Sequence, residues 1–139
     1  MEVTSITDGI IIDHVPAGTA LKVLEYLRID PARHEIALIM NAPSEKFGKK
    51  DIIKIEHMSG VNLDVLGLVA RQATVDVIVD GKMIEKLRPT LPVHVTDVFK
   101  CANPRCVTTS ERSLPQLFHL SHSQRQEYRC DYCDEEVRP

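Results

Sequence analysis

The feature that most constrains this chain is the placement of its four cysteines, all of which lie beyond residue 100 of the 139. They form two close pairs, Cys101-x4-Cys106 and Cys130-x2-Cys133. Pairs with this spacing can each offer two thiolates to one tetrahedral ion, because both sulfurs of a short turn reach about 2.3 Å from the same centre. The pattern predicts a structural zinc site with one Zn²⁺ per chain. Two disulfides or four buried free thiols are the alternatives.

The cysteines lie in a segment that is too short to build a large core. The run Arg88-Pro89-Thr90-Leu91-Pro92 is expected to be extended and stiff. We place a domain boundary at its end, which gives one part over residues 1–92 and another over residues 93–139. About 45 residues is near the limit at which a chain folds unaided. Zinc binding, with a free energy of roughly 10–16 kcal/mol, supplies what such a core lacks.

A site closed by four thiolates has no open coordination position, so it is expected to be structural and not hydrolytic. His94, His119 and His122 lie in the same part, but no His-x-Glu or His-Glu-x-x-His motif occurs. We interpret these histidines as surface or loop residues. A stand-alone zinc enzyme is therefore disfavoured.

Composition and charge narrow the class of protein. Hydrophobic residues make up 43% of the chain and charged residues 27%, as in a soluble globular protein. The formal net charge of −3 is spread over both parts, which argues against nucleic-acid binding, because phosphate neutralisation needs a positive face. No signal peptide or membrane-spanning run is visible. We expect no membrane partner and a cytoplasmic location, where metal ligation is favoured over disulfides.

Residues 1–92 show alternating strand and helix patterns in the order β-α-β-β-α-β-β. This order predicts a ferredoxin-like split βαβ arrangement with two helices on one face of a mainly antiparallel sheet, that is, an α+β fold. A small zinc-ribbon-like β domain is expected to follow. Thr19 and Asn62 are candidate helix N-caps, and Asp80-Gly81 is a hairpin signal. The predicted elements are 9–14, 19–27, 35–40, 50–56, 62–70, 74–79 and 82–87.

Several polar residues fall within the predicted strands of this first part. Lys50 and Lys54 are four residues apart, so the strand period sends both to one face. With Asp13-His14, Asp76 and Lys86 they would form a face able to grip a phosphorylated ligand. The alternative is a solvated face whose charges prevent edge pairing. No glycine-rich phosphate loop and no catalytic triad stands out.

Four strings, followed by the cysteine pattern as a fifth motif in the same order, carry a resemblance to a known family. The chain closely resembles the regulatory chain of aspartate carbamoyltransferase, over nearly its whole length. The strings are Ile12-Asp13-His14-Val15-Pro16-Ala17, Gly48-Lys49-Lys50-Asp51-Ile52-Ile53-Lys54-Ile55-Glu56, Gln72-Ala73-Thr74-Val75 and Arg88-Pro89-Thr90-Leu91-Pro92, followed by the cysteine pairs.

The resemblance implies a non-catalytic regulatory subunit acting in pyrimidine biosynthesis. In this family the N-terminal domain binds CTP, ATP or UTP, and two such domains pair as a regulatory dimer. The zinc domain contacts the catalytic chain, and two catalytic trimers combine with three regulatory dimers. The subunit shifts a tense–relaxed equilibrium of the enzyme that joins carbamoyl phosphate to aspartate.

The resemblance also assigns roles to residues by position. Val3 to Ile6 match the segment that reads the base, Asp13 a ribose contact and His14 a phosphate contact. Lys54 matches a ribose and base contact, and Lys86 a triphosphate clamp. The other matched positions are Asp76, Ile78 and Met83 beside the nucleotide, and Asn103, Glu111, Tyr132 and Asp134 on the surface that docks the catalytic chain.

Two positions depart from the family pattern. Asp76 stands where well-studied members carry an asparagine near the phosphates, and Gly81 stands where they carry a tyrosine. A carboxylate about 5 Å from a phosphate charge costs roughly 3 kcal/mol at an effective dielectric near 20. A bridging Mg²⁺ would reverse that sign.

A rival from another class is a zinc-ribbon adaptor that binds nucleic acid or another protein. For nucleic acid it requires a basic face that bears aromatic residues. Aromatic residues make up only 4% of the chain, which counts against that reading.

Overall fold

The computed structural model describes residues 5–139, so the role predicted for Val3 lies outside the described residues. The chain divides after Thr90 into two compact units. We call residues up to Thr90 the N-terminal unit and residues Leu91–Pro139 the C-terminal unit. No helix in the described part of the chain is long and apolar enough to cross a membrane.

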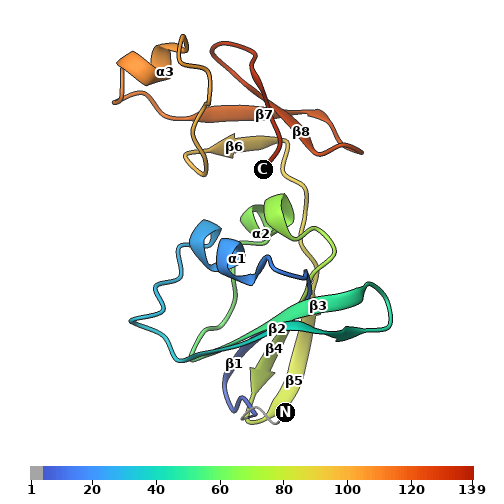
Figure 1. Cartoon of the computed structure of the whole chain (residues 1–139). Coiled ribbons are helices and arrows are strands. Elements are labelled where there is room, and N and C mark those ends of the chain that lie inside the picture. Colours follow the sequence, from blue (N-terminus) through green and yellow to red (C-terminus); the bar gives the residue numbers. More distant parts are fainter. Residues whose placement is uncertain (1–4) are drawn as a thin grey trace. The chain divides into compact units, whose positions relative to one another are not determined.

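The N-terminal unit has the predicted order of elements, and its five strands form one antiparallel sheet in the order β2-β3-β1-β4-β5. Both helices lie on the same face of this sheet (Figure 1). The split βαβ arrangement is therefore confirmed, with β5 added at one edge. The elements are β1 (Gly9–Pro16), α1 (Ala20–Tyr26), β2 (Ile36–Ser44), β3 (Gly48–Glu56), α2 (Leu63–Val69), β4 (Thr74–Val79) and β5 (Lys82–Leu87).

The core of this unit lies between the helices and the sheet. Strand residues at every second position turn their side chains to the same face. In β1, β3 and β4 most inward positions are isoleucine or valine and are almost completely buried, which removes their apolar surface from water. The members with no exposed surface are Ile10, Ile12, Val15, Ala20, Val23, Ile53, Ile55, Leu66 and Val75.

A buried carboxylate joins the sheet to the first helix. Asp51 of β3 is fully buried and accepts hydrogen bonds from the N–H groups of Gly18 at 2.9 Å, Ala20 at 3.0 Å and Asn41 at 2.8 Å. Thr19 precedes α1 as predicted, but its side chain makes no capping bond. Thr19 is therefore the N-cap residue as predicted, but the side chain that bonds the N–H groups at this end of the helix is Asp51 of β3. The Asn62 cap of α2 is confirmed by its bonds to two backbone N–H groups.

Strand β2 is longer than predicted. The strand was expected to end before Asn41, but it continues to Ser44 across an irregularity between Ile39 and Ala42, with Asn41 at φ 59°. Pro43 is tolerated because β2 is an edge strand, where a missing N–H breaks no ladder. The Asp80-Gly81 hairpin is as predicted, since both residues have positive φ, as a type I′ turn requires.

Gly67 allows the chain to pass close over α2. A β-carbon at this position would lie 1.8 Å from the carbonyl oxygen of Thr90. The N–H of Thr90 donates to the Leu63 carbonyl at 3.3 Å, and its hydroxyl donates to the Asp64 carboxylate. The last residue of the N-terminal unit is therefore fastened to the first turn of α2.

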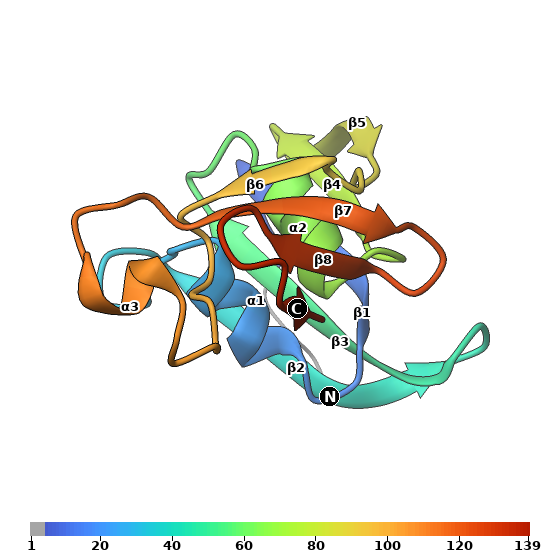
Figure 2. The ribbon, with the colours of Figure 1, turned by 90° about the horizontal axis from the view of Figure 1, so that it is seen from above.

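The C-terminal unit is a small sheet with one short helix. Its strands pair antiparallel in the order β6-β7-β8-β9 (Figure 2). Phe118 and Tyr128 are buried, and Phe99 packs on the Phe118 ring with centroids 4.4 Å apart. This agrees with the predicted α+β class and its small terminal β domain. The elements are β6 (His94–Thr96), α3 (Val107–Ser110), β7 (Leu117–His122), β8 (Glu127–Cys130) and β9 (Glu136–Val137).

Candidate metal centre and ligand face

The four cysteines of the C-terminal unit converge on one point. Their sulfur atoms all lie within 4.8 Å of one another, with 3.6 Å between Cys101 and Cys133 and 3.7 Å between Cys106 and Cys130. A disulfide would require about 2.05 Å, so the sulfurs are not bonded to each other. A zinc ion with four Zn–S bonds of about 2.3 Å implies sulfur–sulfur distances of about 3.8 Å in a tetrahedron. The cluster fits a bound metal ion.

Local hydrogen bonds shape the two turns that carry the sulfurs. The Asn103 side chain accepts from the Arg105 N–H at 3.0 Å, and its carbonyl accepts from the Cys106 N–H at 3.1 Å. In the second turn, Asp134 adopts φ 64° and its N–H donates to the Cys130 carbonyl at 2.9 Å. These bonds hold each turn in the shape that places its two sulfurs on the same side.

The thiols differ in acidity. Burial raises the pKa of Cys101 and of Cys130. Cys106 differs because the Thr108 hydroxyl donates to its sulfur at 3.1 Å, which, with the Thr108 N–H, lowers the pKa of Cys106 to about 7. Bound metal requires thiolates, and Cys106 is the sulfur that loses its proton most readily.

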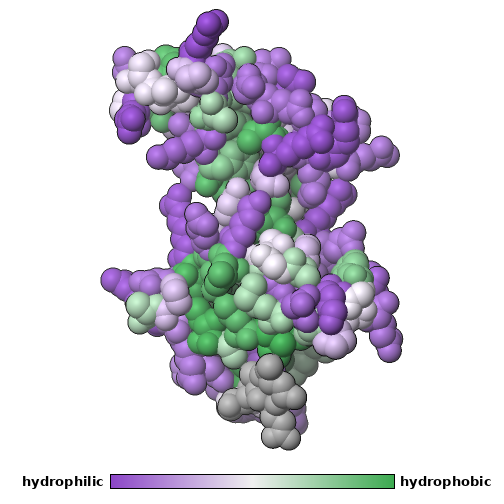
Figure 3. Space-filling model, in the orientation of Figure 1, coloured by the Kyte–Doolittle hydropathy of each residue, from purple (hydrophilic) through white to green (hydrophobic). Residues whose placement is uncertain are grey.

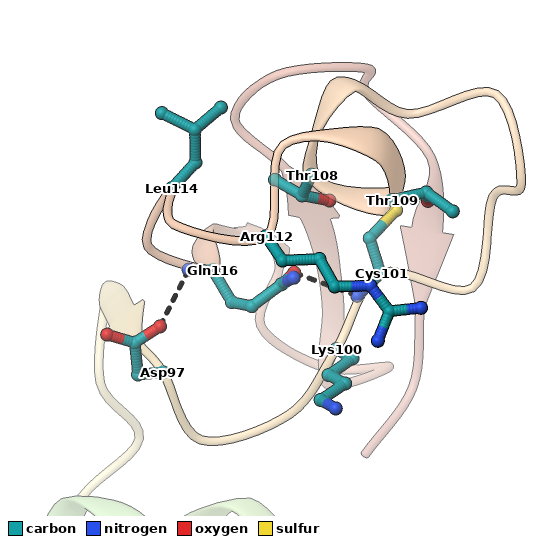
Figure 4. A pocket seen from close by; sticks show the side chains of 8 residues that line it. All are labelled: Asp97, Lys100, Cys101, Thr108, Thr109, Arg112, Leu114 and Gln116. Atoms are coloured by element: carbon teal, nitrogen blue, oxygen red, sulfur yellow. Dashed lines mark hydrogen bonds between the residues drawn. The ribbon is translucent and has the colours of Figure 1, made fainter.

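A cavity of about 300 Å³ adjoins the metal cluster at Cys101 (Figure 4). Lys100 and Arg112 are among the residues that line it, and neither side chain forms an ion pair within residues 5–139. The Gln116 side chain accepts from the Cys101 N–H at 3.0 Å. Asp97 also lines the cavity, so its polar lining includes both basic and acidic side chains. We did not predict it, because residues from six separate points in the sequence line it.

The sheet of the N-terminal unit places four residues in one row. Lys54 of β3 lies opposite Ile11 of β1. Ile11 also lies opposite Asp76 of β4, and Asp76 lies opposite Lys86 of β5. Directly opposite residues share a face of the sheet, and the neighbours of Ile11 in β1 are fully buried toward the helices. The row Lys54–Ile11–Asp76–Lys86 therefore lies on the face that the helices leave uncovered, which we call the open face.

Other residues predicted to bind the nucleotide lie on or beside the same face. Asp13 pairs with Thr74 two positions along β1 from Ile11, and its carboxylate is 3.0 Å from the Lys50 ammonium. The His14 ring is 3.2 Å from the Thr74 hydroxyl. Ile78 lies opposite Met83, which is 56% exposed, and Ile6 is buried. Of the predicted set, the structure thus gathers Asp13, His14, Lys54, Asp76, Ile78, Met83 and Lys86.

Comparison with known proteins decides the family. Residues 1–90 match the family model described as "Aspartate carbamoyltransferase regulatory chain, allosteric domain", and residues 93–139 match "Aspartate carbamoyltransferase regulatory chain, metal binding domain". This chain belongs to the aspartate carbamoyltransferase regulatory chains. The predicted resemblance is confirmed.

Individual relatives agree along almost the whole sequence. A chain named "Aspartate carbamoyltransferase regulatory chain" from Bifidobacterium longum is 67% identical over 138 residues, which cover 99% of each chain. One of the same name from Clostridium botulinum (strain Hall) is 45% identical and covers 97% of this chain and 92% of its own length. A third, from Clostridium tetani, is 45% identical over 136 residues.

Membership in this family establishes that the chain is a non-catalytic regulatory subunit with an allosteric and a metal-binding domain. The residues predicted to dock the catalytic chain lie on the metal-binding turns and at the end of α3. Tyr132 is 38% exposed and donates from its hydroxyl to Pro115, and Asp134 pairs with Arg129 at 3.6 Å. Asn103 shapes the first turn, and Glu111 follows α3. Their docking role stays a prediction.

Sequence reasoning missed two features of the ligand face. Ile11 completes the row between Lys54 and Asp76, and alternation from Asp13 would have identified it. The ion pair between Lys50 and Asp13 had no sequence signal, because it joins two strands 37 residues apart. This pair also occupies the carboxylate that the resemblance assigns to a ribose contact.

Proposed function

We propose that this chain is the nucleotide-responsive subunit of an aspartate carbamoyltransferase. Residues 1–92 bind CTP, ATP or UTP on the open face, and residues 93–139 hold one Zn²⁺ through Cys101, Cys106, Cys130 and Cys133. The zinc domain docks onto the catalytic chain, in an assembly of two catalytic trimers and three regulatory dimers. The subunit thereby controls an early step of pyrimidine synthesis.

The observation that carries the nucleotide proposal is the row on the open face. Lys54 is half-buried in a central strand and Lys86 is exposed on the edge strand, two strands beyond Ile11. The ammonium groups of Lys54 and Lys86 can both contact the negatively charged end of a ligand that lies on this row. Apolar side chains at Ile11 and Met83 offer surface for a sugar or base.

The pairing of two regulatory chains is supported by hydrophobic surface on the N-terminal unit (Figure 3). Leu21 of α1 is 62% exposed and Met40 of the edge strand β2 is 41% exposed. Apolar surface of this kind marks contact regions when it is contiguous. A second copy of the same unit would cover it.

The proposed mechanism is a shift between two global states of the holoenzyme. A nucleotide changes the equilibrium only through its differential affinity for those states, typically about 1–3 kcal/mol. The subunit contributes no reacting group. Lys54 and Lys86 hold the ligand, and the zinc domain passes the change to the catalytic chain that it contacts.

The test is to measure aspartate saturation curves of reconstituted holoenzyme with and without CTP and ATP. We expect the nucleotides to move the midpoint of the wild-type curve. The pair Lys54→Gln and Lys86→Gln should abolish that movement, whereas Lys22→Gln on α1, behind the sheet, should leave it intact. Superimposable wild-type curves would exclude allosteric control by these nucleotides.

A further inference from the structure

Asp76 has a carboxylate oxygen that no group in the described part of the protein hydrogen-bonds. This atom, Oδ1, is buried. Within residues 5–139 the carboxylate also enters no ion pair, although Lys86 lies directly opposite on β5 and Lys54 lies two strands away. Buried polar groups normally have partners, and an unpaired carboxylate is costly.

The other buried or half-buried carboxylates of the described chain all have partners. Asp13 has the Lys50 ammonium and the His14 N–H at 2.6 Å, and Asp51 has three backbone N–H groups. Glu56 accepts from Thr7, and Glu127 accepts from Ser121 and pairs with Arg129. Asp76 is the exception, and it lies in the middle of the open face.

This placement conflicts with the binding of a bare triphosphate. Lys54 on β3 and Lys86 on β5 would draw phosphates to the part of the open face between them, and Asp76 on β4 lies in that part. A carboxylate about 5 Å from one phosphate charge weakens binding by roughly a hundredfold or more at an effective dielectric near 20. A divalent cation between the two anions turns this repulsion into attraction. Mg²⁺ in proteins is commonly held by one or two carboxylates together with substrate phosphates.

We propose that Asp76 is a direct ligand of a divalent cation carried by the nucleotide, so that the open face takes the cation–triphosphate complex and rejects the bare triphosphate. The inference rests on the proposed nucleotide site and adds the metal requirement to it. Lys54 and Lys86 then contact the phosphate oxygens that the cation leaves free. Nucleotide control through this site depends on the free Mg²⁺ concentration.

The experiment is calorimetric titration of CTP into the full zinc-loaded chain, in buffer freed of divalent cations and again with Mg²⁺ in excess. The wild-type chain should bind CTP at least tenfold more tightly with Mg²⁺. Asp76→Asn keeps the size of the side chain and removes its charge. It should bind CTP without Mg²⁺ at least tenfold more tightly than the wild type does, and Mg²⁺ should change its affinity less than threefold.

The matched control is Glu85→Gln, which removes one negative charge from the neighbouring strand at an exposed position that lies opposite Val77, off the open face. It should keep the wild-type dependence on Mg²⁺. Replacing Mg²⁺ by paramagnetic Mn²⁺ locates the bound cation directly. In the wild type, Mn²⁺ should broaden the NMR signals of residues around position 76, and in Asp76→Asn the broadening should be much weaker.

The outcomes separate the two proposals. Wild-type binding of CTP with equal affinity in both buffers would overturn the metal requirement and leave the nucleotide site intact. An Asp76→Asn chain that responds to Mg²⁺ as strongly as Glu85→Gln would also overturn it. Failure of all three chains to bind CTP, ATP or UTP in either buffer would instead overturn the nucleotide site itself.

Discussion

The two units of this chain are held together by different means. In the N-terminal unit, both helices and three strands contribute to one apolar core on the inner face of the sheet. In the C-terminal unit, the buried apolar side chains are few, and Cys106 and Cys130, two of the candidate metal ligands, are among them. A core confined to one face leaves the other face free for a ligand. A unit that relies on a metal ion stays folded only while its cysteines hold that ion.

Metal removal should have the largest effect, because it should destabilise the C-terminal unit and leave the N-terminal unit unchanged. A chelator should unfold the C-terminal unit, because roughly 10–16 kcal/mol of metal-binding free energy supports it. The N-terminal unit should stay folded. Residue-resolved amide hydrogen exchange would show protection lost from β6 to β9 and kept in β1 to β5. Protection that persists in β7 and β8 after the metal has left would contradict the comparison.

The second prediction concerns Asp51, which should matter only to the N-terminal unit. Asp51→Asn keeps the shape of the side chain but turns an amide donor toward backbone N–H groups, so we expect a loss of about 2–4 kcal/mol in unfolding free energy. Urea denaturation followed by hydrogen exchange would measure it. Asp30→Asn, at an exposed acid of the same unit, should change stability by less than about 0.5 kcal/mol.

The third prediction sharpens the role of Gly67. Glycine to alanine in an open helix normally stabilises by about 1 kcal/mol. Here the new methyl group would meet the Thr90 carbonyl, so Gly67→Ala should destabilise the N-terminal unit by about 1–3 kcal/mol. Gly60→Ala, where a β-carbon meets nothing within 4 Å, is the control. A more stable Gly67→Ala chain would show that the segment over α2 is loosely held.

Much of this fold could be predicted because local signals agree with it. The alternation in β1 and β4, the Asp80-Gly81 turn and the Asn62 cap each depend on nearby residues, and each was predicted correctly. The side chain that bonds the N–H groups at the start of α1 could not be predicted, because Asp51 is 31 residues away from Ala20. The extension of β2 through Pro43 depends on its place at the sheet edge, which only the assembled sheet defines.

The candidate sites divide in the same way. The sulfur cluster was predictable because both cysteine pairs are local, and the structure brings them within metal-binding distance. The row Lys54–Ile11–Asp76–Lys86 depends on the register of four strands. Family resemblance named three of these residues. The unpartnered carboxylate oxygen of Asp76 becomes visible only when all its neighbours are placed.

The bond between Thr90 and Leu63 has a mechanical consequence. The chain leaves the N-terminal unit from a point anchored to α2, behind the sheet, while the open face is in front of it. Under the proposed function, a displacement of the open face on ligand binding would be passed to Leu91 through the side chains packed between β1 and α2. Ile12 and Leu66 belong to the one core that lies between the open face and this anchor, so under the proposed function a ligand-induced displacement would have to pass through their packing.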